Sequence, residues 1–202
     1  MAEGRDTAIG AARPGHYGAA GTGVMLAEAT LAAAWNLQGD PSQGAVAAEA
    51  RRLFGVALPL AHGTTARTDH LAALWLGPAS WLLLPRAALP PVDYAAKRDA
   101  LHAAGCALFD LSASRVAWTI SGPRAADVLA KGCPLDFHPR AFAAGSCAQS
   151  VFGPVSVLID KRDDDATLTA MVARSFARDV WHALCEASAQ YGYSVLPPAP
   201  FR

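Results

Sequence analysis

Three side chains between Lys131 and Ser150 are of types that bind metals or act as nucleophiles: Cys133, His138 and Cys147. Zinc favours cysteine and histidine, but the spacing Cys-x4-His-x8-Cys matches no compact zinc knuckle and needs a fourth ligand from elsewhere. Cys147 could instead act as a nucleophile with His138 as its base. Buried thiols and a histidine held by the backbone require no such geometry. We favour this last interpretation and expect no catalytic, cofactor-binding or metal-ligating residue in this chain.

A pair of tryptophans could hold a flat ligand. Trp75 and Trp81 flank a turn at Gly77-Pro78, and their rings could stack on a pterin or a similar ring. The alternative, which we favour, is a pair of core or interface aromatics. The single glycines followed by proline form neither a dinucleotide fingerprint nor a phosphate loop.

The composition is apolar and electrically neutral. Of the 202 residues, 52% are hydrophobic and 17% are charged, and the net charge is +0. No basic footprint for nucleic acid is present, and so little charge favours a surface that a partner covers. The four scattered cysteines indicate reduced thiols. Because we find neither a signal peptide nor an apolar run long enough to span a membrane, we expect a cytoplasmic protein.

Local patterns divide the chain into short strands and amphipathic helices. Val46, Ala50, Leu53 and Phe54 share one helical face, and Gly55 stops that helix. We expect helices over 42–54, with Ser42 as N-cap, over 92–104, from 123 to 131, and from 176 to near 192. We expect strands within 24–37 and over 70–76, 81–84, 106–111, 115–121, 146–152, 155–160 and 167–172.

Two parts of this pattern resemble each other. Trp35 to Asp40 is echoed by Trp118 to Pro123, and a helix follows in each case. The repeat predicts an α+β fold of two ferredoxin-like (split βαβ) halves with mainly antiparallel sheets. The halves span about 24–105 and 106–192. We expect a flexible N-terminal tail over 1–21 and a Pro-rich C-terminal tail over 193–202.

Several segments resemble the small (gamma) subunits of heterotetrameric sarcosine oxidase, within the folate-binding aminomethyltransferase-like superfamily. The most specific is Gly132 to Gln149, which contains Gly132-Cys133-Pro134-Leu135-Asp136, Phe137-His138-Pro139-Arg140 and Gly145-Ser146-Cys147-Ala148-Gln149. Phe109 to Ser112, followed by Trp118 to Pro123, agrees with the same family. The resemblance covers about Val24 to Ala189, and we delimit the gamma-like domain as 22–192.

The resemblance implies a non-catalytic, structural subunit of a flavoenzyme complex. Such complexes oxidatively demethylate sarcosine to glycine, with hydrogen peroxide and methylenetetrahydrofolate as products. FAD, FMN, NAD, tetrahydrofolate and zinc are implied for the partner subunits, which are two larger chains, alpha and beta, and a small delta chain. A related N-methylglutamate dehydrogenase is an alternative.

A free-standing folate-binding aminomethyltransferase-like protein is the second alternative. It requires an acidic residue near the folate amine, for which Asp69, Asp93 and Asp110 are the candidates. In the subunit interpretation, the irregular segment from Lys131 to Ser150 packs or meets a neighbour. We expect an interface there formed by Phe137, His138, Arg140 and Phe142.

Overall fold

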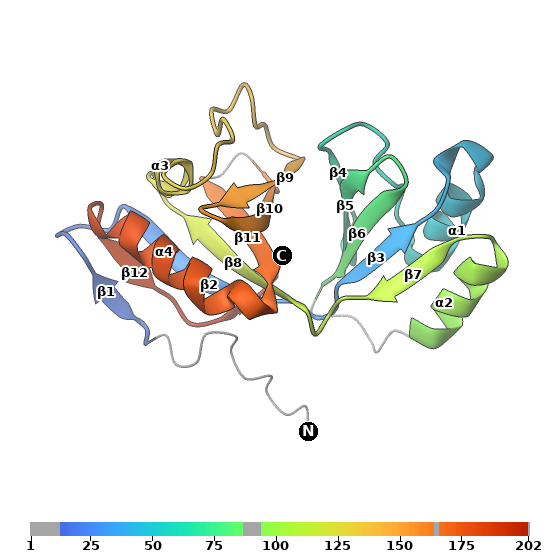
Figure 1. The fold of residues 1–202 in the computed structure, drawn as a ribbon, viewed down its shortest axis with the longest axis horizontal. Coiled ribbons are helices and arrows are strands. Elements are labelled where there is room, and N and C mark those ends of the chain that lie inside the picture. Colours follow the sequence, from blue (N-terminus) through green and yellow to red (C-terminus); the bar gives the residue numbers. More distant parts are fainter. Residues whose placement is uncertain (1–12, 87–93, 164–165, 202) are drawn as a thin grey trace. The chain divides into compact units, whose positions relative to one another are not determined.

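A computed structural model describes residues 13–86, 94–163 and 166–201, which form two compact units (Figure 1). The first unit comprises the described residues of 1–30, 114–144 and 149–199, and the second comprises those of 31–113, 145–148 and 200–202. The predicted α+β class with mainly antiparallel sheets is confirmed. None of the helices in the described ranges is long and apolar enough to cross a membrane.

The first unit is organised around a large sheet in the order β1-β12-β2-β8-β11-β10-β9, and β13 also pairs with β2. Of its pairs, β12 and β2 run parallel, whereas β1–β12, β2–β8, β8–β11 and β10–β11 are antiparallel. The strands are β1 (Gly15–Tyr17), β2 (Val24–Thr30), β8 (Arg115–Ser121), β9 (Ser146–Phe152), β10 (Val155–Lys161), β11 (Thr167–Ala173), β12 (Tyr193–Val195) and β13 (Ala199–Pro200). The helices are α3 (Ala125–Ala130), the 3-10 helix η2 (Arg174–Phe176) and α4 (Ala177–Ala189).

Apolar rows across the strands set the register of this sheet. Ile120 of β8 lies opposite Leu26 of β2 on one side and Leu168 of β11 on the other, and all three are buried. A slip of one residue would turn this row to the opposite face. Trp118 of β8 and Trp181 of α4 lie with ring centroids 6.4 Å apart, so α4 packs on the same face.

The second unit holds a five-stranded sheet in the order β4-β5-β6-β3-β7, in which every neighbouring pair is antiparallel. Its strands are β3 (Trp35–Gln38), β4 (Thr65–Arg67), β5 (Leu71–Gly77), β6 (Ser80–Pro85) and β7 (Ala107–Asp110). Its helices are the 3-10 helix η1 (Pro41–Gln43), α1 (Ala45–Phe54) and α2 (Tyr94–Ala103). The core includes Trp35, Leu37, Val46, Ala50 and Trp81.

The predicted helical face of α1 is confirmed. Val46 and Ala50 are fully buried, and Leu53 and Phe54 pack against the same core. Gly55 ends the helix with φ 67°, as predicted. The predicted capping residue is wrong. The Asp40 carboxylate accepts the Ser42 N–H at the start of η1 instead, and Gly44 precedes α1.

The units depart from the predicted halves at two elements. The halves were placed at about 24–105 and 106–192, but β2 pairs with β8 and belongs to the first unit. Strand β7 pairs with β3 and belongs to the second unit. Strand partners far apart in the chain therefore move both boundaries.

Three short strands lie in the segments predicted as tails. Strand β1 falls within 1–21 and pairs with β12, and the Tyr17 ring stacks on Tyr193 with centroids 5.4 Å apart. Strands β12 and β13 fall within 193–202, and both pair with β2. Backbone pairing and ring stacking make these residues part of the sheet. Residues 1–12 of the predicted N-terminal tail lie outside the described residues.

Candidate functional site

The part of the segment that precedes Gly145 belongs to the first unit and is held in place by contacts within that unit. The rings of Phe137 and Phe142 meet edge to face with centroids 5.9 Å apart, and both side chains are buried. The ammonium of Lys161, itself only 8% exposed, donates to the Phe142 carbonyl oxygen over 3.0 Å. The two phenyl groups therefore hold the segment in place and leave little of their own area for a neighbour.

His138 and Arg140 are the exposed part of the predicted interface. The Asp136 carboxylate accepts the backbone N–H of His138 over 2.9 Å, and the Arg140 N–H donates to His138 Nδ1 over 3.2 Å. One imidazole nitrogen thus accepts from the backbone of the turn, which agrees with the expected histidine held by the backbone.

The three residues considered as candidate metal ligands belong to different units. Cys133 and His138 lie in the first unit, whereas Cys147 lies in the second. The Cys147 thiol donates to the carbonyl oxygens of Thr64 and Trp75, at 3.4 Å each, and the Cys133 thiol lies 3.5 Å from the Ser150 hydroxyl. In the described ranges, no three His, Cys, Asp or Glu residues gather in a way that could hold a metal ion.

The expectation of partly buried thiols is confirmed: Cys106, Cys133 and Cys147 are buried and Cys185 is half-buried. Burial raises the pKa of the Cys106 thiol, and the Glu49 carboxylate raises it further. Burial is also the main cause of the raised pKa of Cys185. Both thiols are therefore poorly suited to form the reactive thiolate at neutral pH.

Trp75 and Trp81, which were considered as a candidate stacking pair, have different environments. Trp81 is fully buried, and its indole N–H donates to the Pro59 carbonyl over 2.7 Å. Trp75 lies opposite it on β5, half-buried, with its ring edge-on to His62 at 4.7 Å. Because the Trp81 ring is part of the core, the pair cannot enclose a ligand between its faces.

Two of the three acidic candidates for a folate amine lie in the described ranges. The Asp110 carboxylate accepts the backbone N–H of Ser112 over 2.9 Å and serves a turn. Asp69 is exposed on the loop before β5. Asp93 lies outside the described residues.

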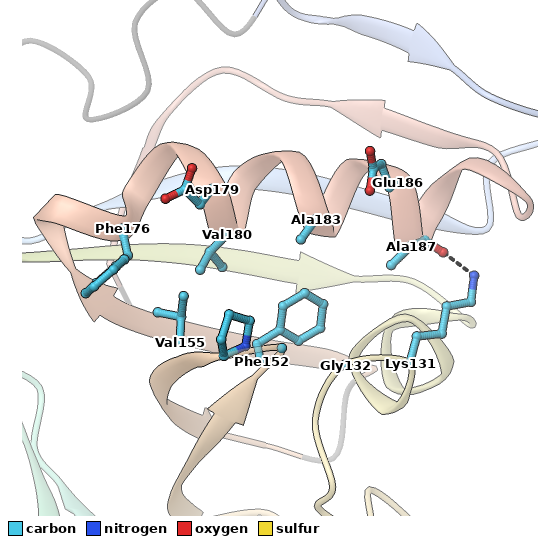
Figure 2. A pocket seen from close by; sticks show the side chains of 12 residues that line it. Lys131, Gly132, Phe152, Val155, Phe176, Asp179, Val180, Ala183, Glu186 and Ala187 are labelled. Atoms are coloured by element: carbon cyan, nitrogen blue, oxygen red, sulfur yellow. Dashed lines mark hydrogen bonds between the residues drawn. The ribbon is translucent and has the colours of Figure 1, made fainter.

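An apolar cavity of about 450 Å³ lies along α4 in the first unit (Figure 2). One wall is formed by Phe176, Val180, Ala183 and Ala187, which face the cavity from η2 and α4. The opposite wall consists of Phe152 to Val155 at the turn between β9 and β10, and Lys131 and Gly132 close one end. We call this cavity the α4 groove.

The α4 groove carries acidic groups at its edge. Asp179 and Glu186 are exposed and lie on one flank of the helix, seven residues apart (Figure 2). Phe176 is 46% exposed at the other end from Lys131. The sequence predicted a helix from 176 to near 192 but not the groove beside it. Phe176 and Val180 lie on the face that lines the groove. The signal was present in the small residues Ala183 and Ala187, which continue that face without filling it.

A comparison with solved structures identifies the class of fold to which the chain belongs. The chain is similar to the glycine cleavage system aminomethyltransferase T from Bartonella henselae, with a TM-score of 0.61 at 14% identity over 88% of this chain and 48% of that chain. At this level of identity the match defines the fold alone, an aminomethyltransferase-like fold.

Closer relatives define the family. A solved chain of the heterotetrameric sarcosine oxidase from Corynebacterium sp. U-96 matches with a TM-score of 0.73 at 29% identity, over 86% of this chain and 88% of that chain. Sarcosine oxidase gamma subunits of Corynebacterium sp. strains P-1 and U-96 are 33% and 32% identical, over 85% and 83% of this chain and 83% and 80% of theirs. The model of the sarcosine oxidase, gamma subunit family matches residues 38–190. The chain therefore belongs to the sarcosine oxidase gamma subunit family.

Proposed function

We propose that this chain is the structural gamma subunit of a heterotetrameric sarcosine oxidase-type flavoenzyme. The observation that carries the proposal is the extent of the similarity, because 33% identity to a sarcosine oxidase gamma subunit spans 85% of this chain and 83% of the relative. A shared fold alone supports no function, whereas similarity over nearly the full length of both chains supports the same place in an assembly.

The assembly that we propose removes the N-methyl group of sarcosine. Two electrons and two protons leave the N-methyl carbon and its nitrogen and reduce dioxygen to hydrogen peroxide by way of a flavin. The one-carbon unit passes to tetrahydrofolate, and the products are glycine and methylenetetrahydrofolate.

We assign FAD, FMN, NAD, tetrahydrofolate and zinc to the alpha, beta and delta partner subunits. Among the residues that the structure describes, no three His, Cys, Asp or Glu side chains gather in a way that could hold a metal ion, and Trp81 is buried in the core. Both observations support this assignment.

We also propose that each unit is built on a split βαβ arrangement. In the second unit, the order β5-β6-β3-β7 of antiparallel strands supports this topology. In the first unit, β10, β11, β8 and β12 follow the same order if β2 is left out of the sheet. Strand β2 is then an addition that separates β8 from β12.

The interface with a neighbouring subunit includes His138 and Arg140 in our proposal. Both are exposed on a segment that Phe137, Phe142 and Lys161 hold in place. A fixed segment loses little conformational entropy when a partner binds. His138→Ala with Arg140→Ala should weaken assembly, whereas exposed Arg98 on α2 provides a matched control as Arg98→Ala.

The experiment that tests this function is co-expression of the tagged chain with the polypeptides encoded beside it. We expect flavin-bearing larger chains to co-purify and the complex to release hydrogen peroxide from sarcosine. Turnover of N-methylglutamate in place of sarcosine would assign the complex to the related dehydrogenases. Purification of this chain alone, with tight tetrahydrofolate binding, would contradict the proposal in favour of a free-standing folate-binding protein.

A further inference from the structure

Two sets of residues on α4 have different surroundings. Trp181 and Leu184 are buried, and the Trp181 ring lies near Trp118 of β8. Ala183 and Ala187 are only half-buried and lie with Phe176 and Val180 on a second stripe that lines the α4 groove (Figure 2). Because Phe176 and Ala187 are eleven positions apart, the stripe is ~16 Å long at 1.5 Å per residue.

The shape of the α4 groove suits a short polypeptide segment. Two alanines on one wall allow a close approach, and Phe152, Pro154 and Val155 provide an apolar surface on the other. A length of ~16 Å accommodates about three turns of helix, or about five residues of extended chain at ~3.3 Å each. The exposed Phe176 ring provides a large apolar contact at one end.

The negative charge at the edge of the α4 groove indicates which side chains the bound segment carries. Asp179 and Glu186 lie two turns apart, ~10 Å along the axis. Within the described part of the chain, neither carboxylate forms an ion pair with a basic side chain. Lys131 at the end of the groove is already engaged, since its ammonium bonds the Ala187 carbonyl and lies over the Tyr191 ring.

We propose that the α4 groove binds a short amphipathic segment of a partner subunit, one that carries apolar residues and two basic residues about 10 Å apart. The apolar side chains fill the groove, and the stems of the basic residues lie along it while their charges reach Asp179 and Glu186. A second copy of this chain fits poorly, because a twofold contact through the same surface brings the two acidic edges together. That the segment belongs to a partner subunit rests on the proposed function.

Photo-crosslinking in the assembled complex tests the proposal. Phe176 is replaced by p-benzoylphenylalanine, which keeps the ring and is tolerated because the side chain is exposed. After irradiation of the co-expressed complex, mass spectrometry should identify one crosslinked partner peptide with two Lys or Arg residues. A crosslink to a second copy or to this chain itself, or no crosslink in an intact complex, overturns the proposal.

Charge reversal provides a second, independent measurement. The double variant Asp179→Lys with Glu186→Lys should raise the dissociation constant of the complex at least tenfold at low salt and should reduce its salt dependence. Asp69→Lys with Asp99→Lys changes the net charge equally at exposed positions of the other unit and should leave the constant unchanged. An equal effect of both pairs overturns the proposal. Failure of the chains to co-purify at all would instead remove the proposed function and this inference together.

Discussion

In each unit, a lysine on or just after one helix donates to a backbone carbonyl of a neighbouring helix. The units differ in how similar their helices are in length. In the second unit, Lys97 of α2 donates to the Leu53 carbonyl in the last turn of α1 over 2.5 Å, with its ammonium 5.1 Å from the centre of the Phe54 ring. In the first unit, Lys131 at the end of α3 donates to the Ala187 carbonyl of α4 and lies 4.5 Å from the centre of the Tyr191 ring.

The helix lengths differ between the units. Helices α1 and α2 have 10 residues each, whereas α3 has 6 and α4 has 13. The difference of seven residues in the first unit corresponds to ~10 Å of helix. Helix α3 is therefore too short to cover α4, and the turn between β9 and β10 faces the rest of it across the α4 groove. The short α3 leaves part of α4 uncovered, and this part lines the α4 groove.

The largest expected difference in stability is between substitutions of the two glycines that follow α1 and α4. Gly55 and Gly192 have φ 67° and φ 66°. A Cβ on Gly55 meets nothing within 4 Å, whereas one on Gly192 would lie 2.1 Å from the Gly21 carbonyl oxygen. We expect Gly55→Ala to cost about 1 kcal/mol of unfolding free energy from backbone strain. Gly192→Ala should cost more than about 3 kcal/mol because the backbone near β2 must move. Chemical denaturation measures both, and equal costs would contradict the packing at the end of α4.

The buried indoles of the two units provide the next contrast. Trp81 donates to the Pro59 carbonyl, whereas the N–H of fully buried Trp118 has no hydrogen-bond partner in the described part of the chain. Trp81→Phe leaves a buried carbonyl unpaired and should cost about 2–3 kcal/mol. Trp118→Phe removes an unpaired donor and should cost about 1 kcal/mol. Urea titrations measure the unfolding free energy of both variants. If Trp118→Phe loses more of it than Trp81→Phe does, then the Trp118 N–H forms an important hydrogen bond.

Much of the fold follows from local patterns in the sequence. Alternation over Arg115 to Ser121 predicts β8 with the bounds that the structure has. The position of β2 between β8 and β12 could not be predicted, because a strand's apolar pattern shows which face is buried but not which strand lies beside it. The N-cap prediction at Ser42 failed because Asp40 offers a carboxylate two residues earlier.

The candidate site was predictable only in part. The segment with the most specific family resemblance contains Phe137 and Phe142, which we expected at an interface. In the structure their rings pack against each other. The α4 groove depends on the length of α3 and on the turn between β9 and β10, which lie far from α4 in the chain. Periodicity within α4 shows an apolar stripe at Phe176 and Val180 but cannot show that part of it lacks a packing partner.

The two lysines provide a smaller contrast. Lys97 is half-buried and Lys131 is exposed, so water screens the second interaction more strongly. Replacement by methionine keeps most of the aliphatic stem and removes the charge. We expect Lys97→Met to cost about 1 kcal/mol and Lys131→Met about 0.5 kcal/mol or less. Thermal denaturation of both variants would measure the difference, and a larger cost for Lys131→Met would contradict it.

The smallest expected effect on stability occurs only at high pH. Burial raises the pKa of Tyr193 in the first unit to about 12 and raises that of Tyr94 in the second, from about 10 in an unfolded chain. Between pH 10 and 12 the unfolded chain loses the Tyr193 proton at a lower pH than the folded chain does, so stability falls as pH rises through this window and is unaffected below it. Tyr94 acts in the same direction. Tyr193→Phe should flatten the loss more than Tyr94→Phe in unfolding curves recorded from pH 9 to 12. Identical slopes for the wild type and Tyr193→Phe would refute the assignment.

The native mass of the assembly tests the central claim most directly. The tagged chain, co-expressed with its neighbouring polypeptides and examined by native mass spectrometry, should occur in a complex with one copy of each of three other chains and with bound flavin. A stable monomer with the mass of this chain, 21.0 kDa, plus that of the tag, observed while the other chains assemble without it, would contradict the account.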